Sequence, residues 1–338
     1  MIRNEIDRRI IKSLSKFFIN NVQIKPGNRL LLIADEQTDP RVYNYLGKVA
    51  QLFIPKGNIA LHIFKKTKSF HYDFPPALVD LLKDADIIIS PTTISIYHAR
   101  ELQQALNKTK KFFSMTGATI ETLYKYGAQA DFVSTSKTAA ALKDLITGCS
   151  RISVFSKAGT HFNGVIEGRN ANMETSIGSF GKSATFPDIE VNTSIVEESG
   201  EGRIIIDGSA TGLGVFNKPV EFIVSRGKIV SIKGGKEAKA AENLLKKTND
   251  PNMYQIAEIG IGLNPFSRIY GVIIEDEAVY GTSHFGIGQN IFMGGMNKAK
   301  THIDFVQKNP QIFLDGNELI LGKDKIAYKN KLMGKVYR

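Results

Sequence analysis

Four short apolar runs, each separated from the next by a segment with helical periodicity, dominate the first 150 residues. The runs lie within residues 29–35, 59–64, 85–90 and 111–114, and the helical segments within residues 4–20, 40–53, 78–83 and 98–106. Runs of this length without polar alternation are typical of strands that are buried on both faces. Strands that alternate with helices predict βαβ units on a parallel sheet. We therefore expect an α/β fold with a Rossmann-like N-terminal domain.

This domain lacks the sequence signature of a dinucleotide site. The first apolar run is followed by Ala34-Asp35-Glu36-Gln37, where a dinucleotide-binding protein would have a glycine-rich turn. The alternation of strands and helices does not by itself indicate a function. We expect the domain to carry no nucleotide.

After about residue 150 the pattern changes to short β-type segments separated by glycine-bearing turns. One helix, predicted over 236–247, interrupts them. This change predicts a second domain of mixed α+β structure, with the boundary near Gly148–Arg151. The expected domains are residues 1–150 and residues 151–338.

Charge and composition exclude several classes of protein. The net charge of +11 raises the question of nucleic acid, but the lysines form short groups such as Lys246-Lys247 and no recognisable binding module. No apolar run is long enough to span a membrane, and the N-terminal residues lack the apolar core of a signal peptide. The single cysteine, Cys149, excludes an intramolecular disulfide. We expect a cytoplasmic protein that binds neither nucleic acid nor membrane.

The residues with the clearest chemical potential lie near the C-terminus. His302 and Asp304 are two positions apart, so on a strand both side chains point to the same face. His284 lies 18 residues earlier, in a glycine-rich segment. Glu190 and Glu258 are acidic residues within apolar segments, where a carboxylate is costly without a cation or several donors. The five residues predict a metal site, although strand ends with incidental acids remain an alternative on spacing alone.

Several segments resemble the aminopeptidase T and aminopeptidase S family of metallopeptidases. The similarity covers most of the second domain and is carried, in order, by Gly159-Thr160, Gly168-Arg169, residues 200–208, residues 257–265, Asp276-Glu277, residues 281–284 and His302-Ile303-Asp304. Lys25-Pro26-Gly27 is a weaker match in the first domain.

The resemblance implies a metal-dependent aminopeptidase that removes N-terminal residues from short peptides. It implies a homodimer with two divalent ions, such as zinc, cobalt or manganese, in the second domain. The implied ligands are Glu190, Glu258, His284, His302 and Asp304. In this interpretation a metal-bound water is the nucleophile, and Glu277 is the candidate catalytic residue for substrate contact or proton transfer.

Two positions depart from the family pattern. The family has a tyrosine seven residues after the first metal histidine, where this chain has Ile291, and an aspartate where this chain has His161. The metal ligands are therefore retained while the groups needed for peptide hydrolysis are incomplete.

The superfamily also contains dioxygenases that open dihydroxypyridine rings with a single non-haem iron. A second interpretation is therefore an Fe(II) oxygenase that uses His284, His302 and Asp304 as a facial triad. The loss of the tyrosine favours it, whereas Glu190 and Glu258 are surplus to such a triad. A third interpretation is a non-catalytic protein that binds a metal or a small molecule. Metal stoichiometry distinguishes the three, and hydrolysis is the main expectation.

Overall fold

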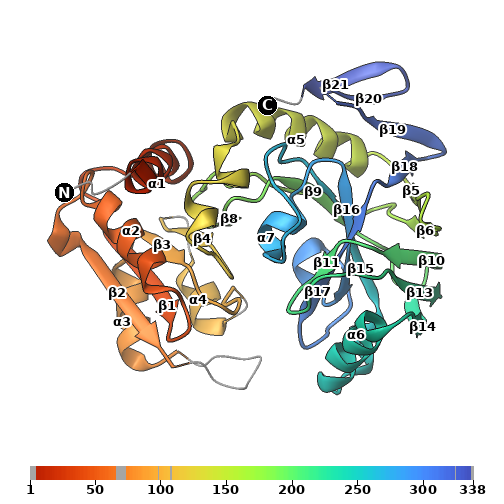
Figure 1. Ribbon diagram of the computed structural model, residues 1–338, viewed down its shortest axis with the longest axis horizontal. Coiled ribbons are helices and arrows are strands. Elements are labelled where there is room, and N and C mark those ends of the chain that lie inside the picture. Colours follow the sequence, from red (N-terminus) through yellow and green to blue (C-terminus); the bar gives the residue numbers. More distant parts are fainter. Residues whose placement is uncertain (1–4, 66–73, 98, 107–108, 324, 336–338) are drawn as a thin grey trace. The chain divides into compact units, whose positions relative to one another are not determined.

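The chain forms two compact units, each assembled from two segments (Figure 1). The computed structural model describes residues 5–65, 74–97, 99–106, 109–323 and 325–335. Unit 1 consists of Met1–Val133 and Thr175–Asp188, and unit 2 consists of Ser134–Glu174 and Ile189–Arg338.

Unit 1 is built on a parallel sheet of five strands in the order β2-β1-β3-β4-β8. Its helices and strands are α1 (Glu5–Lys16), β1 (Leu30–Asp35), α2 (Pro40–Ala50), β2 (Ile59–Phe64), α3 (Pro76–Asp84), β3 (Ile87–Ser90), α4 (Arg100–Ala105), β4 (Lys111–Ser114) and β8 (Ser183–Thr185). Helix α1 continues as a π-helical turn, Phe17–Val22.

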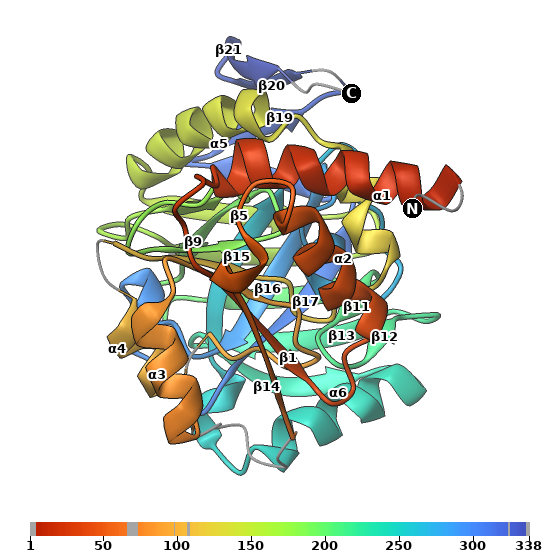
Figure 2. The ribbon, with the colours of Figure 1, turned by 90° about the vertical axis from the view of Figure 1, so that its left-hand side faces the viewer.

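Helices cover both faces of this sheet. Leu31 and Ile33 of β1 share a core with Leu78 and Leu82 of α3 and with Leu102 of α4. Leu32 faces the opposite side, where α2 approaches it closely at Gly47. Figure 2 shows α1 and α2 on one side of β1, and α3 and α4 on the other. Because successive residues of a strand point to opposite faces, a strand covered on both sides must be apolar throughout, as the sequence of β1 is.

One of the two edge strands of the sheet, β8, comes from a distant part of the sequence. β8 pairs in parallel with β4, with Phe113 opposite Ala184. The single boundary expected at residue 150 therefore differs from the structure, in which the chain leaves unit 1 after Val133 and returns to it at Thr175. The physical reason is that a three-residue edge strand has no periodicity that a sequence pattern can reveal.

In its described residues, unit 2 contains two antiparallel sheets, three α-helices and two short 3₁₀-helices. Its elements are α5 (Phe132–Thr147, which begins at the end of unit 1), β5 (Arg151–Phe155), β6 (His161–Val165), β7 (Asn172–Glu174), β9 (Glu190–Ser194), β10 (Glu201–Ile206), β11 (Ser209–Ala210), β12 (Gly214–Val215), β13 (Val220–Ser225), β14 (Lys228–Lys233), α6 (Lys236–Lys247), β15 (Ile256–Gly262), α7 (Ile273–Asp276), β16 (Thr282–Gly288), β17 (His302–Lys308), β18 (Gln311–Leu314), β19 (Asn317–Leu321), β20 (Lys325–Tyr328) and β21 (Lys331–Lys335).

The two sheets of unit 2 pack face to face. The larger sheet has the order β14-β13-β10-β6-β5-β18-β19-β20-β21, and the second, here called the central sheet, has the order β12-β11-β17-β16-β15-β9-β7. Phe162 of the larger sheet contacts Phe285 of the central sheet, with ring centroids 5.4 Å apart, and Phe222 contacts Phe305 at 5.0 Å. These aromatic pairs fill the space between the sheets, so one face of the central sheet belongs to the core.

The predicted fold class is confirmed: a parallel α/β unit is followed by a mixed α+β unit. Among the described residues, no helix combines the length and the apolar character that crossing a membrane requires.

Candidate metal centre

The five residues predicted from the sequence lie on four neighbouring strands of the central sheet. Glu190 begins β9, Glu258 lies on β15, His284 on β16, and His302 and Asp304 on β17. The strand register aligns them, because Glu258 pairs with Gly286, which pairs with Asp304, and His302 pairs with Gly288. Paired residues point to the same face of a sheet. The polar side chains therefore share one face, opposite the aromatic core.

Two glycines make room for the imidazole rings on this face. A Cβ atom added at Gly260, which pairs with His284, would lie 2.0 Å from that ring. A Cβ atom added at Gly286 would lie 2.4 Å from the ring of His302. Both rings thus lie against the backbone of a neighbouring strand, where a side chain would displace them. This close approach explains the glycines in the sequence Glu258-Ile259-Gly260 and around Gly286.

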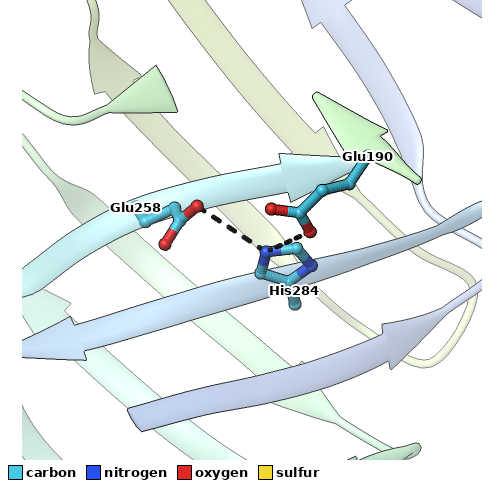
Figure 3. A group of neighbouring side chains, drawn as sticks. All are labelled: Glu190, Glu258 and His284. Atoms are coloured by element: carbon cyan, nitrogen blue, oxygen red, sulfur yellow. Dashed lines mark ion pairs between the residues drawn. The ribbon is translucent and has the colours of Figure 1, made fainter. Parts of the chain in front are cut away.

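The carboxylate of Glu258 lies between the two imidazoles. Its Oε1 is 3.8 Å from Nε2 of His284, and its Oε2 is 2.8 Å from Nε2 of His302. Oε2 of Glu190 lies 3.3 Å from Nε2 of His284 (Figure 3), and Oδ1 of Asp304 lies 2.9 Å from Nε2 of His302. Each imidazole therefore directs the same nitrogen toward two carboxylates.

The orientation of His302 is fixed by a backbone contact. Its Nδ1 lies 2.7 Å from the carbonyl oxygen of Gln289. A carbonyl can only accept a hydrogen bond, so Nδ1 carries the proton and donates it. In the neutral ring, Nε2 then holds the lone pair that a metal ion would use. Such a contact to the second nitrogen is the usual support of a metal-binding histidine.

Two buried atoms of the cluster have no hydrogen-bond partner among the residues that the structure describes. These atoms are Oε2 of Glu190 and Nδ1 of His284. The other carboxylate oxygen of Glu190 accepts a hydrogen bond from the Asn192 amide at 2.7 Å. A buried, incompletely bonded carboxylate is costly unless a cation lies beside it. The donor atoms lie within 4.8 Å of one another in each of two groups that share Glu258, one with Glu190 and His284 and one with His302 and Asp304. With these donors, the deficit fits a divalent metal ion.

The pKa values of Glu190, His284 and His302 are raised above their usual values. Burial raises the pKa of Glu190. Burial also favours the neutral form of His284, but the charges of Glu190 and Glu258 outweigh it and raise the pKa of His284 to about 9. The pKa of His302 is raised well above its usual value because Asp304 and Glu258 outweigh burial in the same way. Without a metal ion, protons therefore balance the charge of the carboxylates, and a metal ion must displace them.

Glu277, the predicted catalytic residue, directly follows α7 and is partly buried. One of its carboxylate oxygens lies within 4.8 Å of one from Glu190, which places Glu277 beside the cluster. Its role remains a prediction.

The two positions that depart from the aminopeptidase pattern are not among the five predicted ligands. His161 is exposed on β6 of the larger sheet, where its ring contacts Phe155 at a centroid distance of 4.8 Å. Neither of the two metal-binding groups centred on Glu258 includes it. Ile291 is exposed in the loop that follows β16.

An aromatic residue next to Ile291 was missed by the sequence analysis. The ring of Phe292 packs edge to face on that of His302, with centroids 5.5 Å apart and planes at 68°. The exposed apolar pair Ile291-Phe292, seven and eight residues after His284, is the signal that could have identified it. Gln289 was also missed, because it contributes a backbone oxygen, which any residue could provide.

Comparisons with known proteins give consistent results. The family model for NicX, 2,5-dihydroxypyridine 5,6-dioxygenase, matches residues 20–324. A 2,5-dihydroxypyridine 5,6-dioxygenase from Pseudomonas putida is 28% identical over 259 residues, which cover 73% of this chain and 72% of that protein. The solved structure of a 2,5-dihydroxypyridine dioxygenase from the same species has a TM-score of 0.78 and 21% identity, covering 95% of this chain and 98% of that one. Wild-type AmpT from Thermus thermophilus has a TM-score of 0.63 and 12% identity, covering 98% and 100%.

These matches correct the main functional expectation. The predicted aminopeptidase reaction, with its assignment as a peptide hydrolase, is wrong, because the family match and the curated relative are dioxygenases. The likeness to AmpT reflects a shared fold. The expectations of an enzyme and of a metal cofactor are supported by the dioxygenase relative and by the carboxylate and histidine groups.

Proposed function

The chain belongs to the 2,5-dihydroxypyridine 5,6-dioxygenase family, and we propose that it opens a dihydroxylated pyridine ring with molecular oxygen at an iron(II) ion. The bond between ring carbons 5 and 6 breaks, and both atoms of O2 enter the ring-opened product, so the reaction needs no external reductant. The observation that carries the proposal is the convergence of two imidazoles and Asp304 on one face of the central sheet, within a chain matched to this family over residues 20–324.

His284, His302 and Asp304 are the residues proposed to hold the ion. Two histidines and one carboxylate form the donor set typical of non-haem iron oxygenases. A bound iron(II) ion would supply the redox chemistry with oxygen that amino-acid side chains lack. His302 is already oriented for this role by its hydrogen bond to Gln289.

Glu258 and Glu190 are the carboxylates that such a triad does not require, and their positions suggest what they do. Glu258 lies between the two imidazoles, with its carboxylate oxygens 3.8 and 2.8 Å from their Nε2 atoms. It would therefore lie next to an ion bound by these nitrogens and would offset part of its charge. Glu190 faces His284 and is itself held by Asn192. We assign to both carboxylates the role of compensating the charge of the ion.

Glu277 is proposed to accept the proton of a substrate hydroxyl group. It is partly buried and borders the cluster through Glu190. A dihydroxylated ring is a better electron donor once a hydroxyl is deprotonated, and a positioned carboxylate is a common proton acceptor for such a step.

The experiment that tests the function is oxygen uptake by iron-loaded protein. The protein is purified without metal-chelating resins, loaded with iron(II) under nitrogen, and mixed with 2,5-dihydroxypyridine and a known amount of oxygen. We expect one iron per chain, consumption of one O2 per substrate, and a product that carries both labelled atoms when 18O2 is used. The zinc-loaded protein is the control and should consume no oxygen. Iron-loaded protein that leaves both oxygen and substrate unchanged would overturn the proposal.

A further inference from the structure

The loop between β16 and β17, residues 289–301, carries exposed apolar side chains, and one of them, Phe292, packs on His302 of the candidate metal centre. Ile291, Phe292 and Met296 are all exposed, and the exposed fraction of Phe292 is 44%. Large apolar residues in an exposed loop are unfavourable in water and often mark a binding surface. The β16–β17 loop follows the strand of His284 and leads directly to His302.

A nearly buried ion pair holds this loop in place. The carboxylate of Glu197 accepts hydrogen bonds from the Asn290 amide and from the backbone N–H of Met296, both at 2.8 Å. Arg169 donates to Glu197 and to the carbonyl oxygen of Gly294. The side chains of Arg169 and Glu197 are only 11% and 16% exposed. Three positions along the loop are therefore tied to one pair of charges.

Further contacts fix the part of the loop that carries Phe292. The hydroxyl of Ser194 donates to the carbonyl oxygen of Met293 at 3.0 Å. The Asn290 side chain fills the space beside Gly295, where an added Cβ atom would lie 2.1 Å away. These contacts fix the backbone on the C-terminal side of Phe292 and so define its position in the loop.

Phe292 and Gln289 connect the loop to the same ligand. Gln289 orients His302 through Nδ1, and the ring of Phe292 packs against the imidazole at a centroid distance of 5.5 Å. A flat ring bound at an ion held by His302 would lie near this half-exposed aromatic ring.

We propose that Phe292 is a specificity-determining residue that packs against the flat ring of the substrate. The inference rests on the proposed function, which supplies a planar heteroaromatic substrate. Aromatic rings attract one another in stacked or edge-to-face arrangements, beyond the burial of apolar area. The rigid loop keeps Phe292 ready for this contact, so binding requires little ordering. A planar, hydroxylated six-membered ring is the class of ligand that this surface selects.

The test is substrate binding without turnover. Iron(II)-loaded protein is titrated with 2,5-dihydroxypyridine by calorimetry under nitrogen, where the missing oxygen prevents reaction. Phe292→Leu keeps an apolar side chain and removes the ring, and we expect Kd to rise about 3–10-fold. Phe292→Tyr keeps the ring and should bind as the wild type does. Met296→Ala is the matched control, because Met296 lies in the same loop and contacts Glu197 through its backbone.

Iron content distinguishes a substrate contact from a merely structural role. A residue that only supports His302 would change the iron stoichiometry in Phe292→Leu, whereas the proposal predicts one iron per chain and a changed Kd for the ring. Unchanged substrate binding in Phe292→Leu, or a loss explained by lost iron, would overturn the inference and leave the proposed function intact. A wild-type protein that binds iron but not the substrate would overturn both.

Discussion

The Nδ1–H of His302 donates a hydrogen bond to the backbone oxygen of Gln289, at 2.7 Å. The bond joins the last strand of the cluster to the start of the β16–β17 loop, so the ring that would bind iron and the loop that carries Phe292 are fixed together. A change in the loop should therefore affect the position of His302. Loss of the His302 side chain should leave the carboxylates of Glu258 and Asp304 facing each other.

Replacing His302 by alanine should abolish stable iron binding. Glu258 and Asp304 would lose the imidazole between them, at 2.8 and 2.9 Å. Loss of a single supporting contact to a metal ligand typically reduces affinity about 10–100-fold, so loss of the ligand should exceed that. Iron content after gel filtration measures the effect. His161→Ala is the control and should retain full iron, because His161 lies on the larger sheet. Equal iron in both variants would refute the assigned site.

A methyl group at position 260 should disrupt the cluster. In Gly260→Ala the new Cβ atom would lie 2.0 Å from the ring of His284, so the ring must move. Overpacking of this kind costs about 1–3 kcal/mol in the free energy of unfolding. Urea denaturation of the metal-free protein and iron content should both report it. Gly57→Ala is the control and should change neither, because no atom of the described residues lies within 4 Å of the added Cβ. An unaffected Gly260→Ala protein would mean that His284 does not lie over that strand.

Metal binding should strengthen as pH rises and should release protons. The pKa of His284, raised to about 9, means that its imidazole is protonated at pH 7 in the metal-free protein. A metal ion needs the neutral ring, so affinity should rise about tenfold per pH unit for each displaced proton, until the pH passes that pKa. Calorimetry in two buffers of different ionisation enthalpy measures the protons. An apparent binding enthalpy that is independent of the buffer would contradict this expectation.

The same pKa values predict how stability without a metal depends on pH. His284 has a folded-state pKa above its unfolded value, so its contribution is fully present below about pH 6.5 and is lost as pH rises through about 9. Burial raises the pKa of Glu190 to about 7, so its contribution is lost at lower pH, as pH rises from about 4.5 through about 7. Because the folded state retains more protons, the free energy of unfolding should fall from neutral to alkaline pH. His284→Asn should flatten this part of the profile, and a wild-type profile that rises there would be inconsistent with it.

Removing Arg169 should destabilise the protein far more than removing a comparable exposed arginine. Arg169→Met leaves Glu197 buried without its ion-pair partner, which typically costs about 3–5 kcal/mol. Arg226→Met breaks the ion pair between Arg226 and Glu198, whose two side chains are 77% and 68% exposed. This change should lower the free energy of unfolding by less than about 1 kcal/mol. Chemical denaturation of both variants makes the comparison. Equal losses would show that the buried pair does not hold the loop.

Glu277→Gln should slow turnover without loss of iron. If Glu277 accepts a substrate proton, the neutral amide cannot replace it, and kcat should fall about 10²–10⁴-fold. Iron content and anaerobic substrate binding serve as controls for folding and for the site. An unchanged kcat would remove Glu277 from the mechanism.

The sequence predicted most of what positions the site. The apolar run of β1 indicated a doubly covered strand because both of its faces are packed. The spacing of His302 and Asp304 placed both on one face, since strands alternate with a period of two. β8 was missed because its pairing with β4 is set by tertiary structure, far along the chain.

The reaction could not be predicted in the same way. Imidazoles and carboxylates hold zinc as well as iron, so the ligand pattern is compatible with hydrolysis and with oxygenation. Ile291 and His161, in place of the family tyrosine and aspartate, were the two departures that argued against a peptidase. The neighbouring contact between Phe292 and His302 depends on the path of the loop, which spacing does not reveal.

The return of the chain to unit 1 has a consequence for synthesis on the ribosome. When β4 has emerged, the strand that covers its outer edge, β8, has not yet been made. The backbone N–H and C=O groups at this edge of β4 stay unpaired until residues 183–185 have been synthesised. A fragment that stops at residue 150 would keep this edge open permanently and would tend to aggregate. Both halves should therefore be produced as one polypeptide.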